Sequence, residues 1–326
     1  MAKVLVTGGL GFIGHNVVVL LEQQGHQVAI MDNETDYGIV PTDELQYLIQ
    51  ERKHKICTNS IYHCDIADGD INLAFEYFKP DIVIHLASFP RQKVVNSNPQ
   101  WGSRVMSEGL LNLLETSTKY GVRKFVYVSS SMVYGNFRSD YYDGVDEHHE
   151  TNPIGQYGIM KLAGEWLVKD YQHRTKMAYT IIRPSAVYGP LDVEDRVVSK
   201  FLLTAMRGGV IQVNGHKEAL DFTFVSDITE GIVAAAISES TDNMTYNVTR
   251  GRSRTLLEAA ELAVKIVGQG TIQINEPDNS FPSRGQLNIT RAYNDFGFIP
   301  EIDIEQGFKE YYEWLKNSLY WAKKTV

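Results

Sequence analysis

The stretch Lys3-Val-Leu-Val-Thr-Gly-Gly-Leu-Gly-Phe-Ile-Gly14 joins a short apolar strand to a loop with glycines at positions 8, 11 and 14. The apolar residues from Phe12 to Leu21 predict a helix directly after the loop. One glycine lets the chain reverse where a Cβ atom would clash, and a second lets the backbone approach a pyrophosphate. The third lets helix and strand pack tightly, and the helix N-terminus offers N–H groups to the phosphates. The stretch therefore predicts a site for a dinucleotide.

A second strand, Gln27–Met31, follows this helix and ends at Asp32, with Asn33 next to it. An acid at this place hydrogen-bonds the adenosine ribose and repels a 2′-phosphate, so it favours NAD over NADP. The spacing alone also allows an ordinary strand–helix–strand turn with a solvated Asp32. Strand, loop, helix and acid together favour the dinucleotide interpretation.

Composition narrows the classes of protein to consider. The chain has 326 residues, 43% of them hydrophobic, and a formal net charge of −9. Such a chain can form one large core or two domains, and its acidic balance does not favour nucleic acid as a partner. No apolar run is long enough to cross a membrane, and a strand beginning at residue 3 leaves no room for a signal peptide. Cys57 and Cys64 are the only cysteines, which favours reduced thiols and a cytoplasmic location.

Strand-like and helix-like segments alternate over the first 183 residues, which predicts an α/β fold: a doubly wound parallel sheet of the Rossmann type. The expected strands are 3–7, 27–31, 60–63, 81–86, 124–129 and 178–183, and the main expected helices are 12–24, 102–120 and 155–173. We expect residues 1–183 to form an NAD-binding domain and residues 184–326 a smaller α/β substrate-binding lobe. Within that lobe, residues 222–249 are expected to rejoin the main sheet, through Phe224-Val225, a helix at 227–238 and a strand at 245–248.

Three segments bring side chains to the carboxyl ends of the strands, the first being His85-Leu-Ala-Ser88 after the fourth strand. Ser129-Ser-Ser131 follows the fifth strand, and Tyr157 precedes Lys161 by one helical turn. A positive charge near a phenol lowers its pKa, so Lys161 is expected to tune Tyr157 as a base for a sugar or alcohol hydroxyl. Each element alone has a plainer interpretation: a turn for the serines and a solvated helix face for Tyr157 and Lys161. Their order on a dinucleotide-binding scaffold favours a catalytic site.

With these residues in place, the chain resembles the extended short-chain dehydrogenase/reductase superfamily, in its NAD-dependent nucleotide-sugar epimerase/dehydratase family, of which UDP-glucose 4-epimerases are members. The resemblance covers essentially the whole chain. Its motifs are Thr7–Gly14, Asp32, Asp65-Ile66, His85-Leu-Ala87, Ser129–Gly135, Tyr157 with Lys161, Arg183–Pro190, Asp221–Asp227 and Arg284 before Phe296–Pro300.

The resemblance implies Tyr157 as the base, Lys161 as its partner and Ser130 as the hydroxyl anchor, with Ser131 as the fallback. It implies NAD contacts from Gly8, Gly11, Phe12, Ile13, Asp32, Asn33, Asp65, Ile66, Leu86, Ala87, Ser88, Tyr157, Lys161 and Pro184. Substrate contacts are expected from Ser130, Ser131, Arg91, Ser185 and Arg284. A UDP-sugar is the expected substrate, and a homodimer the expected assembly.

The residues after the anchor separate the reactions of this family. Its 4,6-dehydratases carry an Asp-Glu pair there and its decarboxylases usually a Glu, whereas this chain has Ser131-Met132. A 4-epimerase needs no second acid–base pair, because hydride leaves the sugar and returns to its other face. Two alternatives stay open: an NAD(P)-dependent nucleotide-sugar dehydrogenase or keto-reductase, and a non-catalytic NAD(H)-binding or sensing protein.

Several positions depart from the family pattern. Leu220 stands where an Arg usually grips the diphosphate, and Met106 replaces a helical Asn. Arg284 is still available for the diphosphate, with Arg91, Arg183 and Arg196 as further candidate cations. The acidic loop Asp146–Glu150 lacks the ligand spacing of a metal site and is expected to be solvated, so no metal is expected.

The expected helices 102–120 and 155–173 resemble the pair that forms a four-helix dimer interface in the family. Their apolar residues fit either that interface or burial within one subunit. These residues are Leu110, Leu111, Leu113, Leu114, Trp166 and Leu167.

Overall fold

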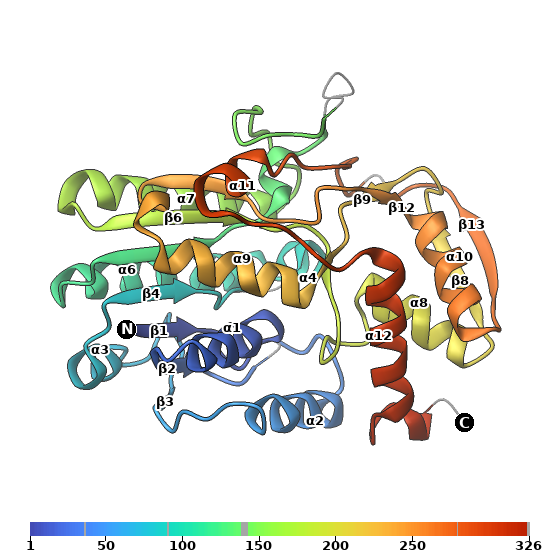
Figure 1. Cartoon of the computed structure of the whole chain (residues 1–326), viewed down its shortest axis with the longest axis horizontal. Helices are drawn as coiled ribbons and strands as arrows, with labels where there is room; N and C mark the ends of the chain where they lie inside the picture. Colours follow the sequence, from blue (N-terminus) through green and yellow to red (C-terminus); the bar gives the residue numbers. More distant parts are fainter. Residues whose placement is uncertain (36, 90, 138–142, 279, 325–326) are drawn as a thin grey trace.

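The computed structural model describes residues 1–35, 37–89, 91–137, 143–278 and 280–324. At its centre lies a seven-stranded parallel sheet in the order β3-β2-β1-β4-β5-β6-β11 (Figure 1). The strands are β1 (Lys3–Thr7), β2 (Gln27–Asp32), β3 (Ile61–His63), β4 (Ile82–His85), β5 (Lys124–Val128), β6 (Ala178–Arg183) and β11 (Met244–Asn247). This strand order, which reverses between β1 and β4, is that of a doubly wound dinucleotide-binding sheet. The predicted α/β class is confirmed.

Helices cover both faces of the sheet, because alternate side chains of each buried strand point to opposite sides. Val4 and Val6 face one cluster of buried side chains, whereas Leu5 faces the other. The first face carries α1 (Phe12–Gln23) and α9 (Val225–Ile237), and the second carries α3 (Asn72–Phe78), α6 (Gly109–Lys119) and α7 (Gln156–Thr175).

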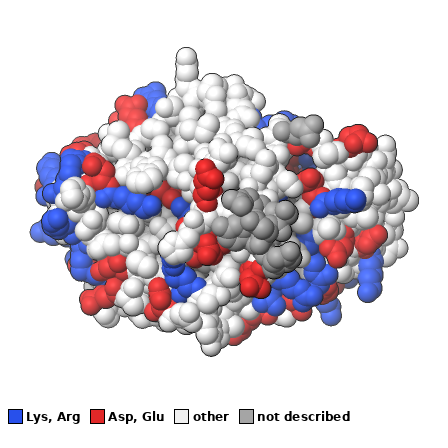
Figure 2. Space-filling view, turned by 90° about the horizontal axis from the view of Figure 1, so that it is seen from above, with Lys and Arg blue, Asp and Glu red and all other residues white. Residues whose placement is uncertain are grey.

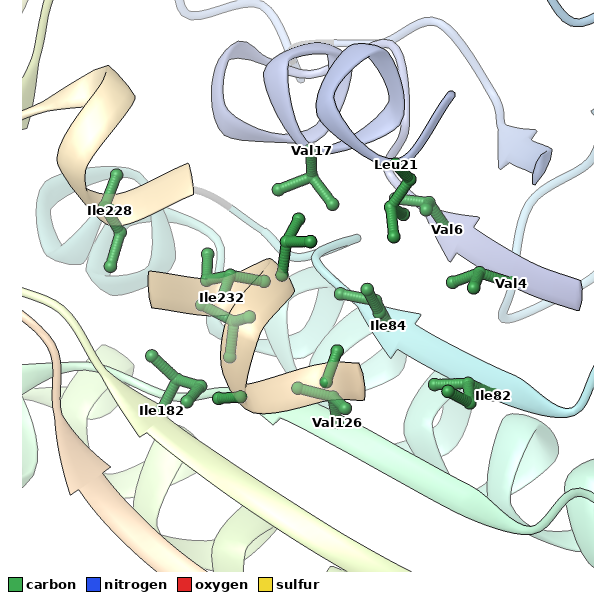
Figure 3. Close-up of a cluster of buried hydrophobic side chains, with 14 of the residues drawn as sticks. Val4, Val6, Val17, Leu21, Ile82, Ile84, Val126, Ile182, Ile228 and Ile232 are labelled. Atoms are coloured by element: carbon green, nitrogen blue, oxygen red, sulfur yellow. The ribbon is translucent and has the colours of Figure 1, made fainter. Parts of the chain in front are cut away.

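Aliphatic side chains fill the space between the sheet and the α1–α9 pair (Figure 3). Ile228 and Ile232 of α9 lie beside Val17 and Leu21 of α1, above valines and isoleucines of the strands. All four are fully buried, and burying each such side chain contributes about 1.5–3 kcal/mol. This layer holds the carboxyl ends of the strands in fixed positions.

The segment after β6 builds a smaller lobe, seen on the right of Figure 1. Its helices α8 (Val197–Met206), α10 (Leu256–Val267) and α12 (Ile304–Asn317) enclose a separate apolar core. Its strands are β7 (Val187–Tyr188), β8 (Val210–Asn214), β9 (Ala219–Leu220), β10 (Thr223–Phe224), β12 (Arg254–Thr255) and β13 (Thr271–Asn275).

Part of this segment returns to the main sheet. Strand β11 pairs with β6, and α9 packs on α1. However, β10 pairs with β7 in a separate two-stranded sheet. The expectation that Phe224-Val225 joins the main sheet is therefore wrong, because Phe224 ends the β10 strand and Val225 already begins α9.

The expected helix at 102–120 is divided in the structure. A short helix α5 (Pro99–Ser103) leads through a π-helical turn (Arg104–Glu108) into α6. Such turns often occur near functional sites. The sequence analysis does not predict α2 (Thr42–Lys53), α4 (Gln92–Ser97) or α11 (Thr290–Phe296), nor does it give bounds for α3, α8 and α10.

Charged side chains of both signs are interspersed on the face seen from above (Figure 2). Among the described residues, no helix has both the length and the apolar character needed to span a bilayer.

Candidate active site

A cavity of about 750 Å³ opens between the carboxyl ends of the strands and the small lobe. The glycine loop lies in its wall together with Tyr157, Lys161 and Arg284. Among the described residues, the lining includes all the expected cofactor and substrate contacts except Asp65. Residues separated by more than 270 positions in the chain thus meet around one space.

The glycine loop is shaped by backbone contacts that a side chain would disrupt. Gly8 has φ +70°, and a Cβ atom there would lie 2.6 Å from the Ala87 nitrogen. A Cβ atom on Gly14 would lie 2.0 Å from the Gly8 carbonyl oxygen. Gly11 precedes α1, and no side chain caps that helix end. These features fit the pyrophosphate of a dinucleotide, which needs close backbone approach and a helix N-terminus.

Asp32 holds the loop after β2. Its Oδ2 atom accepts a hydrogen bond from the Leu10 N–H at 2.9 Å, and its Oδ1 atom accepts one from the Glu34 N–H at 2.7 Å. Burial raises the pKa of this carboxyl, and these two backbone N–H groups oppose the rise. Asp32 thus ties the glycine loop to the place where a ribose is expected.

Asp65 and Ile66 differ in their placement. Ile66 is buried and lines the cavity, whereas Asp65 accepts a hydrogen bond from the Asn33 side chain at 2.9 Å and from the Ala67 N–H at 2.8 Å. Asp65 thus fixes Asn33, which does line the cavity.

Ser130, Tyr157 and Lys161 come together as expected. The Ser130 hydroxyl, two residues after β5, lies close enough to the Tyr157 phenol to lower its pKa, and it accepts from the Met132 N–H at 3.2 Å. The Lys161 Nζ atom lies 5.8 Å from the centre of the Tyr157 ring and donates to the Val128 carbonyl at 2.8 Å. Burial lowers the pKa of Lys161 to about 8, and Glu165 opposes this.

The electrostatics of Tyr157 differ from the expectation. Burial raises the pKa of its phenol, and the charges of Arg196 and Arg284 and the Ser130 hydrogen bond oppose the rise. Lys161, which we expected to lower the phenol pKa, is not among the groups that do so. The cations that favour phenolate come from the small lobe.

Two further hydroxyls point to a ligand. The Oγ atoms of Ser131 and Ser185 are buried and have no hydrogen-bond partner within the described part of the chain. Both serines line the cavity. An unpartnered buried hydroxyl is unfavourable unless a ligand completes it.

Of the candidate cations, Arg91 and Arg284 have buried nitrogen atoms without a partner among the described residues: Nε and Nη2 of Arg91, and Nε of Arg284. Arg91 also forms an ion pair with Asp195. Burial lowers the pKa of Arg284 to about 10, opposed by Glu218 and Tyr157. Both side chains can still donate to an anion in the cavity.

Arg183 is not available for a ligand, contrary to expectation. Its guanidinium is held in the interior by Glu165, at 2.9 Å and 2.6 Å, and by the Tyr134 hydroxyl at 2.9 Å. Leu220, in place of the family Arg, packs on the apolar core of the small lobe.

The structure adds cavity residues that the sequence did not indicate, among them Tyr37, Arg52 and Asp192. The Tyr37 ring lies 4.3 Å from the Phe89 ring, between centroids. Arg52 sits in α2, a helix without a strong apolar pattern, so no motif marks it.

His85 and the acidic loop Asp146–Glu150 make contacts within the protein. His85 hydrogen-bonds to the Thr7 hydroxyl at 2.7 Å, and burial lowers its pKa to about 3. In the acidic loop, Glu147 accepts from the Asn247 N–H at 2.7 Å. Within the described ranges, no three His, Cys, Asp or Glu side chains gather closely enough to hold a metal ion.

Comparison with known proteins indicates the same family as the sequence motifs. The model of the NAD-dependent epimerase/dehydratase family matches residues 4–249. The UDP-glucuronate 4-epimerase 1 of Arabidopsis thaliana is 27% identical over 338 residues, covering 96% of this chain and 76% of that protein.

Two solved structures are similar over nearly the whole chain. The UDP-glucose 4-epimerase of Thermotoga maritima with UDP-glucose is 27% identical, with 97% and 99% of the two chains covered and a TM-score of 0.85. The UDP-glucuronic acid 4-epimerase of Bacillus cereus, in complex with UDP-glucuronic acid and NAD, is 24% identical, with 96% and 99% covered and a TM-score of 0.87. The second likeness supports the fold.

Proposed function

The chain belongs to the NAD-dependent epimerase/dehydratase family, and from that premise we propose that it is a nucleotide-sugar 4-epimerase. The observation that carries the proposal is the placement of Ser130, Tyr157 and Lys161 in the wall of one cavity, with Ser131 and Met132 rather than an acid–base pair after Ser130. Neither Ser131 nor Met132 can shuttle protons at neutral pH. Water elimination therefore has no support at this position, whereas epimerisation needs only one base.

The proposed site residues divide between two ligands. For NAD they are Gly8, Gly11, Phe12, Ile13, Asp32, Asn33, Ile66, Leu86, Ala87, Ser88, Tyr157, Lys161 and Pro184, with Asp65 acting through Asn33. For the nucleotide sugar they are Ser130, Ser131, Arg91, Ser185 and Arg284. We propose that the domain of residues 1–183 and 222–249 carries the first set, with Pro184 directly at its boundary, and that the lobe within 184–326 closes over the second.

The reaction follows from these positions. Ser130 holds the sugar 4-hydroxyl by a hydrogen bond, and Tyr157 accepts its proton as the base. The residues named above would hold NAD, which would supply an acceptor and later a donor for the hydride of carbon 4. The resulting 4-keto sugar turns in the cavity, so that hydride returns to the opposite face while Tyr157 gives the proton back to the oxygen. Lys161 keeps its charge near the ring throughout.

A UDP-sugar is the proposed substrate class. Support comes from relatives whose names state that they act on UDP-glucose or UDP-glucuronate and from two arginines with unpartnered donors in the cavity wall. Such donors suit a diphosphate, because a guanidinium binds its oxygens in a forked geometry.

We also propose a homodimer in the cytoplasm. Leu111, Ile159 and Trp166 on α6 and α7 are 38%, 52% and 64% exposed, and a second α6–α7 pair would cover them. Leu110, Leu113 and Leu114, by contrast, are buried within the subunit. The two cysteines are free, in keeping with a reducing compartment.

The test is incubation with UDP-glucose, UDP-glucuronate or UDP-N-acetylglucosamine without added reductant. We expect the 4-epimer to appear, by NMR of the sugar, without net formation of NADH. Tyr157→Phe should lower turnover about 10²- to 10⁴-fold because it removes the base. The matched variant Tyr77→Phe, at a residue 73% exposed, should be fully active.

Other outcomes would point elsewhere. NADH accumulating in step with turnover would support a dehydrogenase instead. Bound NAD with no turnover of any of these sugars would support a sensing protein.

A further inference from the structure

Arg52 lies between the two halves of the cavity. It is 5% exposed, and its Nη1 atom donates to the Leu10 carbonyl at 3.1 Å while Nη2 donates to the Leu191 carbonyl at 2.7 Å. Leu10 belongs to the glycine loop of the sheet domain, and Leu191 to the segment that enters the small lobe. One buried guanidinium therefore bridges the cofactor side and the substrate side.

The Leu10 peptide is held on both sides. Its N–H donates to Asp32 at 2.9 Å, and its carbonyl accepts from Arg52 at 3.1 Å. Any change that fixes Asp32 also fixes Leu10, and through it one half of the Arg52 guanidinium. The chain of contacts thus begins at the carboxylate placed for the cofactor ribose.

At Leu191, the other residue that Arg52 contacts, the backbone is strained. Leu191 has φ +69° although it is not glycine, a conformation that is sparsely populated for such residues. It is 1% exposed. Helix α2 also holds the next part of this segment, because Glu44 accepts from the Glu194 N–H at 2.8 Å. A strained segment that one helix holds at two points has a defined arrangement that can be lost.

This segment carries substrate-side groups. Asp195 pairs with Arg91, and Asp192, 2% exposed, lies 3.9 Å from the Arg196 Nε atom. Arg196 is one of the cations that favour the phenolate of Tyr157. The position of residues 191–196 therefore decides where these charges stand in the cavity.

We propose that Arg52 is a positioning residue that couples the NAD site to the substrate lobe, so that NAD and the nucleotide of the substrate strengthen each other's binding. The inference rests on the proposed nucleotide-sugar function. Because coupling is reciprocal, each ligand must raise the affinity for the other by the same factor. Two carbonyls about one guanidinium need its fork, which a lysine cannot supply.

The experiment measures that factor by calorimetry. UDP is titrated into the protein with and without saturating NAD, for the wild type, Arg52→Met and Arg52→Lys. The matched control is Arg174→Lys, at an exposed arginine paired with Asp170 on α7. We expect NAD to tighten UDP binding at least about five-fold in the wild type and the control. In both Arg52 variants, the ratio of the UDP affinities with and without NAD should fall to near one, while UDP still binds.

A second measurement uses the wild type alone, in case the Arg52 variants do not fold. NAD should slow amide hydrogen exchange in residues 191–196, most clearly at Glu194, without UDP present. Unchanged exchange there would overturn the inference, as would an undiminished coupling factor in the variants. A wild type that binds NAD but never UDP would overturn the nucleotide-sugar function together with the coupling.

Discussion

Arg183 and Glu165 form a buried ion pair directly behind the three serines of the site, with two parallel hydrogen bonds of 2.9 Å and 2.6 Å. The Glu165 carboxylate also accepts from the Ser129 hydroxyl at 2.6 Å. Burial opposes the Arg183 charge, but Glu165 and Tyr134 together raise the pKa of its guanidinium. The pair joins β6 to α7, the helix that carries Tyr157 and Lys161.

Glu165→Gln should therefore destabilise the protein strongly, by about 3–5 kcal/mol, because it leaves Arg183 charged, buried and without its counterion. Chemical denaturation measures this change. Asp170→Asn breaks the exposed pair with Arg174 on the same helix and should change the free energy of unfolding little. Equal effects of the two substitutions would contradict the role of the buried pair.

Gly14→Ala should release NAD. The added Cβ atom would stand 2.0 Å from the Gly8 carbonyl oxygen, so the loop must shift away from the phosphates. We expect NAD affinity to fall at least about tenfold, equivalent to about 1.4 kcal/mol, measured by the NAD retained after gel filtration. In the control Gly285→Ala, the nearest atom would lie 3.9 Å from the added Cβ atom, so this variant should retain NAD. Equal retention of NAD in both variants would contradict the role of Gly14 in the loop that binds the phosphates.

Lys161 makes stability depend on pH. Its folded pKa is about 8, below the ordinary 10.5, so between these values the unfolded chain binds more protons at this residue. The contribution of Lys161 to stability must then rise as the pH increases from about 8 to about 10.5. The difference in unfolding free energy between the wild type and Lys161→Met, followed by urea denaturation, should shift in favour of the wild type across that window. A difference that stays flat would mean that the folded pKa is not lowered.

Arg284→Gln should alter both binding and the pH profile. Loss of a charge-assisted hydrogen bond of about 1.5–3 kcal/mol predicts an increase in KM for a UDP-sugar of about 10- to 150-fold. Arg284 also opposes the rise in the pKa of Tyr157. Its removal should therefore shift the pH profile of kcat to more alkaline pH, together with the increase in KM. Arg123→Gln, at a side chain 44% exposed, is the control, and a normal KM for Arg284→Gln would remove it from the substrate site.

Trp166→Glu should yield a monomer. Trp166 is 64% exposed on α7, and burying a carboxylate at a dimer interface carries a large cost of removing it from water. Analytical ultracentrifugation measures the assembly state. Tyr77→Glu, at a residue 73% exposed on α3, places the same charge away from that face and should leave the assembly as it is. A Trp166→Glu protein that sediments like the wild type would place the contact elsewhere.

The central sheet could be predicted because each buried parallel strand is a short apolar run, and because the glycine loop fixes the first turn. The small lobe could not be predicted in the same detail. Its strands β8 and β13 pair although about sixty residues separate them, and strands of two residues carry no periodicity. Phe224 was placed in the wrong sheet for this reason.

The candidate site, too, could be predicted from the sequence only in part. Motif spacing was enough to bring Ser130, Tyr157 and Lys161 together. The pKa of Tyr157 depends on burial and on Arg196 and Arg284, which only the tertiary structure places nearby. Arg183 looked available in the sequence because nothing there reveals that Glu165 faces it.

The last strand of the sheet has a consequence for how the protein is made. Strand β11 pairs Asn247 with Arg183, so the edge beside β6 stays open until residue 247 of 326 has left the ribosome. Chains grow from the N-terminus at about 5–20 residues per second, and the segment between β6 and β11 must be synthesised while that edge is exposed. During these seconds the nascent chain presents unpaired backbone groups along β6, to which another strand could pair.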